Sequence, residues 1–421
     1  MAETFENNHL KITLKKKGFN RYTKISFPVK YGIYSEIETD KYIFQFNLED
    51  EIVRAKSKDI SWINPSEWLK RTMGNDWIYY STGGYSGVFE AIGEYYLPNF
   101  QYSTNSLIGG KPFKEHLVCR IVTKWHEIIK KIDKYNDVPG KFNTFIKNIL
   151  DRSDNHLSRK AEKLFKIIHN RASVLPPDAR HVDYDIIPVN ISLGCLYHCR
   201  FCRVKTRHGF SLLSRKNITC QIKSLKRLYG KDIINYNSIF LGEHDGLNAP
   251  VDLIVFAAEQ ACYEFDFRHS YMGPGRLFLF GSVDALLGMA KRDFEKLCAL
   301  PFYIHINIGL ESADQETLDL LGKPLSVEKI REAYIMIRNI NIKYDNIEIS
   351  SNFIFDDTLP ENHYTALLKL VDLEYKSFKN KGDIYLSPLH TGAPSRAELY
   401  KFNYLKMRCP VPTFLYIIQR L

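Results

Sequence analysis

The sequence predicts an α/β protein in which a partial (β/α)6 barrel of the TIM type follows an α+β N-terminal domain. From residue 186 onward, short apolar runs alternate with helix-like stretches, which is typical of parallel strands joined by crossover helices. Before residue 186 the sequence does not show this alternation. The length of 421 residues is enough for two or three domains. We therefore expect an N-terminal domain over residues 1–180, a barrel over 185–390 and a C-terminal extension over 391–421 that packs on the barrel.

Strands are predicted in the first 110 residues, because these are rich in aromatic and β-branched residues. The candidate runs are KITLKKKG, TKISFPVKYGIY and KYIFQFNLEDEIVRAK, the last with a hairpin turn at Leu48 to Glu51. Apolar residues then recur at intervals of three and four from Pro112 to Tyr135 and from Lys141 to Ala172, which predicts two long helices. The following stretch, VLPPDARHVDYDIIP, is typical of a linker.

Six apolar runs predict the six barrel strands. They read IIPVNISL, NSIFLG, RLFLF, YIHINIGL, IEISSNFIF and DIYLSPL. Near-continuous Ile, Leu and Phe is typical of parallel strands that are buried on both faces. Because barrels of this type carry their chemistry on the loops after the carboxyl ends of the strands, we looked for reactive residues there.

Charge and composition limit the classes of protein that fit. The formal net charge is +10, and residues 111–180 hold 16 Lys and Arg against 8 Asp and Glu, so the predicted helices are basic. Such a face could attract phosphates or nucleic acid, or it could be an ordinary solvated helix surface. The sequence has no apolar run long enough to span a bilayer and no secretory signal at its start, so we expect a cytoplasmic protein without membrane contact.

Three of the eight cysteines, Cys195, Cys199 and Cys202, follow the first predicted barrel strand directly. Thiolates are soft ligands that suit zinc or iron-sulfur clusters. A structural zinc site needs four ligands, usually as two separated pairs, and the loop offers only His198 as a fourth. Three thiolates suit a cubane cluster that keeps one iron open to a substrate. Three buried thiols without metal are the remaining alternative.

The spacing Cys-x-x-x-Cys-x-x-Cys, with Phe201 before the last cysteine, resembles the signature of the radical S-adenosylmethionine (radical SAM) superfamily. Phe240 to Glu243 resembles the Gly-Gly-Glu motif of that family, although Leu241 replaces the first glycine. Ile308 to Asp314 resembles the fourth-strand segment of the branch with oxygen-independent coproporphyrinogen oxidases and elongator-like enzymes. Asn352 to Phe355 resembles the fifth-strand element, with Asp356 in place of the usual glycine.

The resemblance covers residues 185–390 and implies a 4Fe-4S cluster on the three cysteines, with S-adenosylmethionine as cosubstrate. It further implies reductive cleavage to a 5′-deoxyadenosyl radical that abstracts hydrogen from a small-molecule or peptide substrate, and an external electron donor of the flavodoxin or ferredoxin type. The cofactor-binding residues that it implies are Phe201, Gly242, Glu243, Ser282, Asp284, Glu311, Ser312, Asn352 and Ile354.

Several alternatives stay open at this point. The substrate could be RNA, favoured by the basic region, or the protein could be a non-catalytic iron-sulfur or metal-binding protein. Cys409 could donate hydrogen to a product radical or be a buried structural thiol. The N-terminal domain could form a lid over the barrel through the glycine-rich loop Gly83 to Gly87, or it could be a detached module that binds a partner.

Overall fold

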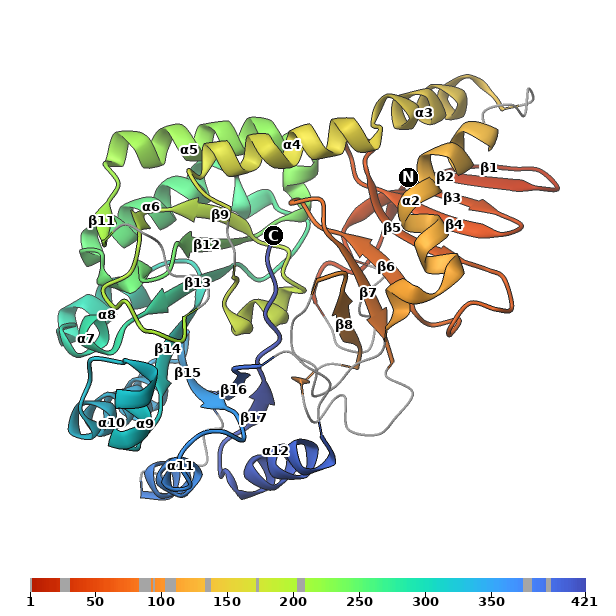
Figure 1. Cartoon of the computed structure of the whole chain (residues 1–421). Helices are drawn as coiled ribbons and strands as arrows, with labels where there is room; N and C mark the ends of the chain where they lie inside the picture. The colour runs from red at the N-terminus through yellow and green to blue at the C-terminus, as the bar shows by residue number, and fades with distance from the viewer. Residues whose placement is uncertain are drawn as a thin grey trace.

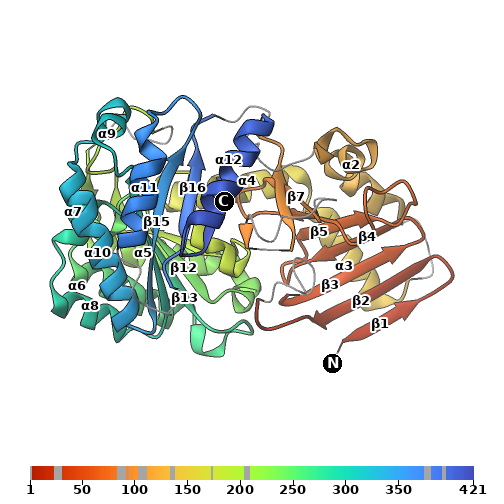
Figure 2. The ribbon, with the colours of Figure 1, turned by 90° about the horizontal axis from the view of Figure 1, so that it is seen from below.

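The computed structural model describes residues 2–22, 31–82, 92–93, 95–102, 111–132, 138–171, 174–202, 209–373, 381–390 and 395–421. Two sheets lie side by side, an antiparallel sheet at the N-terminus and a curved parallel sheet that follows it (Figures 1 and 2). The predicted fold class, a partial TIM-like barrel preceded by an α+β domain, is confirmed. Within the described residues, no helix is both long enough and apolar enough to cross a membrane.

The N-terminal sheet has eight antiparallel strands in sequence order. They are β1 (Glu3–Glu6), β2 (Leu10–Lys17), β3 (Ile33–Thr39), β4 (Tyr42–Phe46), β5 (Ile52–Ser57), β6 (Trp68–Arg71), β7 (Trp77–Ser81) and β8 (Leu97–Phe100). The predicted hairpin turn joins β4 to β5. One face of the sheet carries alternate apolar residues such as Phe44 and Phe46, which share a buried core with Trp125 and Phe145 of the helices.

The chain after this sheet forms three helices, where the sequence predicted two. After the short turn η1 (Pro112–Lys114) come α2 (His116–Ile132), α3 (Gly140–Asp151) and α4 (Asp154–Ile167). The second predicted helix is broken because Ser153 is extended at the N-cap of α4. The carboxylate of Asp154 then accepts a 2.7 Å hydrogen bond from the indole of Trp125, which holds the start of α4 against α2.

The parallel sheet has seven strands in the order β17-β16-β15-β14-β13-β12-β9, one more than predicted. The strands are β9 (Ile187–Asn190), β12 (Ser238–Gly242), β13 (Arg276–Gly281), β14 (Tyr303–Glu311), β15 (Ile347–Phe355), β16 (Ile384–Pro388) and β17 (Thr413–Leu415). The first six match the six predicted runs, and β17 comes from the C-terminal extension. A small hairpin of β10 (Ser192–Leu193) and β11 (Ser211–Leu212) follows β9.

Crossover helices cover the outer side of this sheet (Figure 2). They are α5 (Arg215–Tyr229), α6 (Val251–Glu264), α7 (Val283–Leu287), α8 (Lys291–Cys298), α9 (Gln315–Leu321), α10 (Val327–Lys343), α11 (Asn362–Leu373) and α12 (Arg396–Arg408). Short 3-10 turns are η2 (Pro177–Val182), η3 (Gly230–Asn235), η4 (Gly246–Asn248) and η5 (Phe267–His269).

The segment predicted as a linker is buried, so that prediction is wrong. Its turn η2 lies against the amino-terminal part of the barrel interior, where Ser350 Oγ donates to Asp178 at 2.5 Å and Arg180 pairs with Asp383 at 2.5 Å. Asp183 then pairs with Lys70 of β6 at 2.7 Å, and both side chains are buried. This stretch therefore closes the bottom of the barrel, the end at which the parallel strands begin, and attaches the N-terminal sheet to it. The attachment contradicts the detached-module alternative.

We expect that Lys70→Ala will lower the free energy of unfolding by about 3–5 kcal/mol, because it leaves the carboxylate of Asp183 buried without its cation. Urea unfolding followed by circular dichroism measures this change. Lys124→Ala on the exposed side of α2 is the control and should stay close to wild type. An equal effect of the two substitutions would contradict the role assigned to the buried pair.

Candidate functional site

A cavity of about 220 Å³ opens at the carboxyl ends of the barrel strands. All three clustered cysteines line it, together with residues that follow β12, β13 and β14. Its side wall includes Val174, from the segment before η2, and Tyr416 and Ile418, which follow β17. The described residues that line the cavity all come from position 174 or later. The glycine-rich loop Gly83 to Gly87, our candidate for a lid, lies outside the described residues.

The cysteine loop is held in place by contacts at both sides. The backbone of Cys195 pairs with that of Gly209 next to the β10–β11 hairpin. The beginning of the cysteine loop and the chain at Gly209 therefore lie side by side. The hydroxyl of Tyr197 donates to Asp284 of α7 at 2.5 Å. The backbone N–H of Arg200 donates to Leu321 at the end of α9 at 3.0 Å. The backbone between the cysteines is thus attached to two separate helices.

Burial favours the protonated thiols of Cys195 and Cys199 in the apoprotein. It raises the pKa of Cys195 to about 11, and it also raises the pKa of Cys199, while the nearby ammonium of Lys323 acts in the opposite direction on both. Since metals bind thiolates, a cation must displace these protons when it binds. The donor set therefore fits a strongly binding thiophilic metal group.

The three sulfur atoms do not suit a single metal ion. Within the described residues, the only close set of three side chains that could share one ion lies elsewhere, at Asp178, His181 and His305. A tetrahedral zinc with Zn–S bonds of about 2.3 Å would hold its sulfurs only about 4 Å apart. A cubane cluster distributes its thiolates over different irons and needs wider spacing. Among the described residues, the three thiols thus do not form a set close enough to share one ion.

A buried charged pair, Glu311 and Lys323, forms one wall. The ammonium of Lys323 lies 3.5 Å from the Glu311 carboxylate and donates to the carbonyl of Gly309 at 2.7 Å. Burial raises the pKa of Glu311, and Lys323 opposes this rise. A β-bulge between Gly309 and Glu311, with Glu311 at a φ of 67°, brings both residues to the cavity. A strained backbone of this kind is typical of functional sites.

Five of the nine predicted cofactor-binding residues line the cavity. They are Phe201, Ser282, Glu311, Asn352 and Ile354. Ser282 caps α7, and its backbone N–H donates to Asp245 at 2.8 Å. Asn352 donates to Asn307 on the neighbouring strand at 2.6 Å. The structure thus gathers residues from four strand ends and from the cysteine loop at one place.

The other four predicted cofactor residues do not line the cavity, and each has a contact of its own. Gly242 accepts a backbone bond from Ile191, and Glu243 is buried beside the loop base, where it accepts from Asn170 and Gly194. Asp284 holds Tyr197, as described above. Ser312 bonds to the ring of His363 at 2.7 Å.

Cys409, for which the sequence left open a hydrogen donor or a buried structural thiol, is buried at the end of α12 and is not among the described lining residues.

Sequence reasoning missed several lining residues. Asn307 belongs to the row that continues to Gly309 and Glu311, because alternate residues of a strand share a face. That periodicity could have found it. His244 and Asp245 directly follow Glu243, and burial lowers the pKa of His244 to about 4, so its ring is neutral. Lys323 becomes a neighbour of Glu311 only through the fold.

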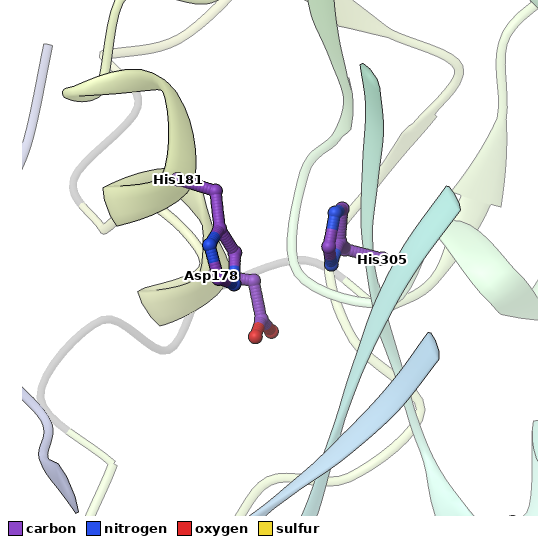
Figure 3. Close-up of side chains that lie close together, drawn as sticks. All are labelled: Asp178, His181 and His305. Atoms are coloured by element: carbon purple, nitrogen blue, oxygen red, sulfur yellow. The ribbon is translucent and has the colours of Figure 1, made fainter. Parts of the chain in front are cut away.

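The second cluster, Asp178 and His181 on η2 with His305 on β14, lies at the opposite end of the barrel (Figure 3). Arg276 donates to Nε2 of His305 at 2.7 Å, so this nitrogen is not available to a metal. Asp178 accepts from Ser350 and Tyr385, and burial raises its pKa to about 7. We therefore interpret this cluster as a hydrogen-bonded plug and not as a metal site.

Part of the chain is similar to known proteins. Residues 189–363 match the model of a family described as the Radical SAM superfamily. Similar solved structures include the cobalamin-dependent S-adenosylmethionine radical enzyme OxsB with aqua-cobalamin bound, at 16% identity and a TM-score of 0.34 over 52% of this chain. The chain spans 29% of the OxsB chain. Elp3 of the archaeon Methanocaldococcus infernus matches 48% of this chain and 52% of its own, at 11% identity and a TM-score of 0.31. No curated protein matches the sequence.

The plug at Asp178 predicts a pH dependence of stability. Because its folded pKa of about 7 exceeds the unfolded value of about 3.9, the folded state binds the extra proton, and stability falls as pH rises from 4 to 7. Between pH 5 and pH 7 the free energy of unfolding of the wild-type protein should fall by about 2 kcal/mol. The Asp178→Asn variant should not show this fall. Urea unfolding of both proteins at the two pH values measures the difference, and parallel profiles would contradict the assignment.

Proposed function

Since residues 189–363 match the model of the radical SAM superfamily, we propose that the protein binds a 4Fe-4S cluster on Cys195, Cys199 and Cys202 and uses it to cleave S-adenosylmethionine. The observation that carries the proposal is one cavity that holds these three thiols and the polar ends of β13, β14 and β15. When bound, the cluster supplies the electron that converts S-adenosylmethionine to methionine and a 5′-deoxyadenosyl radical.

The chain's own residues have distinct tasks in this proposal. Tyr197 and Arg200 hold the cysteine loop against α7 and α9, so the thiols stay at the strand ends. Glu311 offers a buried carboxylate as an acceptor for hydroxyl or ammonium groups of the cosubstrate. Phe201 and Ile354 supply apolar surface, which suits a base or a thioether.

Water must be kept from a radical, and the cavity wall suggests how this chain does so. Val174, Tyr416 and Ile418 cover the side of the cavity near the open edge of the sheet. The hydroxyl of Tyr416 donates to the carbonyl of Leu175 at 2.8 Å, which holds this wall together. An apolar, fixed wall favours hydrogen abstraction from a bound substrate over quenching by solvent.

For the electron, we propose an external donor of the flavodoxin or ferredoxin type. Helices α4 and α5 lie side by side (Figure 1), and their outer faces expose basic side chains. The exposed basic residues are Arg159, Lys163 and Lys166 on α4 and Arg215, Lys216, Lys223, Lys226 and Arg227 on α5. Such a face suits an acidic donor. As the second substrate we propose a small molecule or a peptide.

The cluster proposal predicts the iron content of cysteine variants. Anaerobically reconstituted wild-type protein should be brown with about four iron and four sulfide. Each of the substitutions Cys195→Ala, Cys199→Ala and Cys202→Ala should remove most of the iron and sulfide, because each thiolate would ligate its own iron. Cys220→Ala, at an exposed position of α5, is the matched control and should keep the cluster. Colourless protein with stoichiometric zinc would contradict the proposal.

The role of Glu311 predicts an effect on cosubstrate affinity. Glu311→Gln in the reconstituted protein should raise the Kd for S-adenosylmethionine about tenfold or more, since hydrogen bonds to a buried charged group contribute about 1.5–3 kcal/mol. Titration calorimetry under anaerobic conditions measures the Kd. Asp319→Asn, an exposed carboxylate on α9, should leave it unchanged. An unaltered Kd for Glu311→Gln would remove Glu311 from the site.

A further inference from the structure

A row of polar residues crosses the face of the N-terminal sheet that the helices leave uncovered. Gln45 of β4 pairs with Arg54 of β5, and Arg54 pairs with Lys70 of β6. All three side chains are buried. Because Lys70 reaches Asp183, this face lies toward the barrel. The row is thus a polar layer between the two parts of the protein.

A second cavity, of about 70 Å³, lies at this layer and away from the cysteines. The cavity is lined by Arg54 of the N-terminal sheet and by Gln419 of the C-terminal stretch. It is also lined by Tyr236 and Met272, which lie in the chain just before β12 and β13. Since β12 and β13 are parallel, the chain before them belongs to the bottom of the barrel. The cavity is therefore separate from the proposed cofactor site, which lies at the carboxyl ends of the strands.

Arg54 is a buried cation without a counter-ion in the described structure. Its side chain is 6% exposed, and it takes part in none of the hydrogen bonds or ion pairs found among the described residues. Its Nε is a buried donor without a partner, and the cross-strand neighbour Gln45 has an unpartnered Oε1. Burial of an unpaired guanidinium is costly, so the site calls for an anion or for ordered water.

The nearby carboxylates are already engaged by other groups. Asp183 and Asp185 both pair with Lys70, at 2.7 and 2.8 Å. Asp232 accepts from the backbone of Leu48 and from Asn235. None of them lies within ion-pair distance of Arg54 in the described part of the chain. All three carboxylates line the same cavity as Arg54, but none of them forms a hydrogen bond or ion pair with its guanidinium in this part of the structure.

We propose that this cavity is a binding site for a small oxyanion, a phosphate or carboxylate group, held by the guanidinium of Arg54 between the two parts of the protein. A guanidinium presents paired N–H donors that match two oxygens of such a group. The cavity volume suits one such group or a few water molecules. The ligand would contact the N-terminal sheet and the barrel together, and by binding only the folded state it would stabilise their union.

The test uses the full chain, purified in chloride buffer, with inorganic phosphate and acetate as separate probes at constant ionic strength. Phosphate or acetate should raise the Tm of the wild-type protein by about 2 °C or more at saturation. Arg54→Gln should abolish the rise, and Arg54→Lys should weaken it, because lysine keeps the charge without the paired donors. Arg159→Gln, on the exposed side of α4, should keep the full rise.

The two probes separate the sources of the ligand, since a response to phosphate alone indicates a phosphate site and a response to acetate alone a carboxylate site. No rise with either probe, or a rise that persists in Arg54→Gln, overturns the proposal. If Arg54→Gln does not fold, a crystal structure of the wild-type protein grown with tungstate decides. Density within hydrogen-bond distance of the guanidinium supports the site, and a cavity filled only by water overturns it.

Discussion

Seven parallel strands leave a barrel open, and the rest of this structure depends on how that opening is sealed. The edges of the sheet are β9 and β17. Near β9, the side chain of Asn190 donates to the carbonyl of Ile168 at 2.7 Å. Near β17, Leu175 and Gln419 join through a 2.7 Å backbone bond. The chain before the barrel and the chain after it therefore meet in the gap. The same two stretches supply the side wall of the cysteine cavity and part of the anion cavity.

The barrel interior contains a layer of polar residues at mid-height, unlike the apolar core that fills a complete TIM barrel. On β15 the inward row runs from Ser350 to Asn352, and Asn307 on β14 donates to Ser350 at 2.8 Å. Below this layer, the carboxylate of Asp178 is fully bonded within the protein. Above it, Glu311 and the thiols face the cavity. Polar groups at the carboxyl ends of the strands therefore remain available to a ligand.

Sequence periodicity predicted all six runs that became β9, β12, β13, β14, β15 and β16, because strands buried on both faces have a strong apolar signal. It missed β17, since Thr413–Leu415 is a three-residue strand fixed by tertiary pairing with β16. It also misread the segment around Asp178 as a linker, because its prolines and charges look like a surface loop and are satisfied only by distant partners such as Ser350. Cys195, Cys199 and Cys202 stand close together in the sequence, whereas Lys323 and Glu311 meet through a bulge that leaves no local pattern.

The central claim is that one cavity holds both the cluster and S-adenosylmethionine, with one iron left open because the loop supplies three thiolates. Electron paramagnetic resonance of the anaerobically reconstituted and reduced protein, recorded with and without S-adenosylmethionine, tests it most directly. The account predicts a 4Fe-4S signal whose g values shift when S-adenosylmethionine is added. A cluster signal that S-adenosylmethionine leaves unchanged would contradict the account.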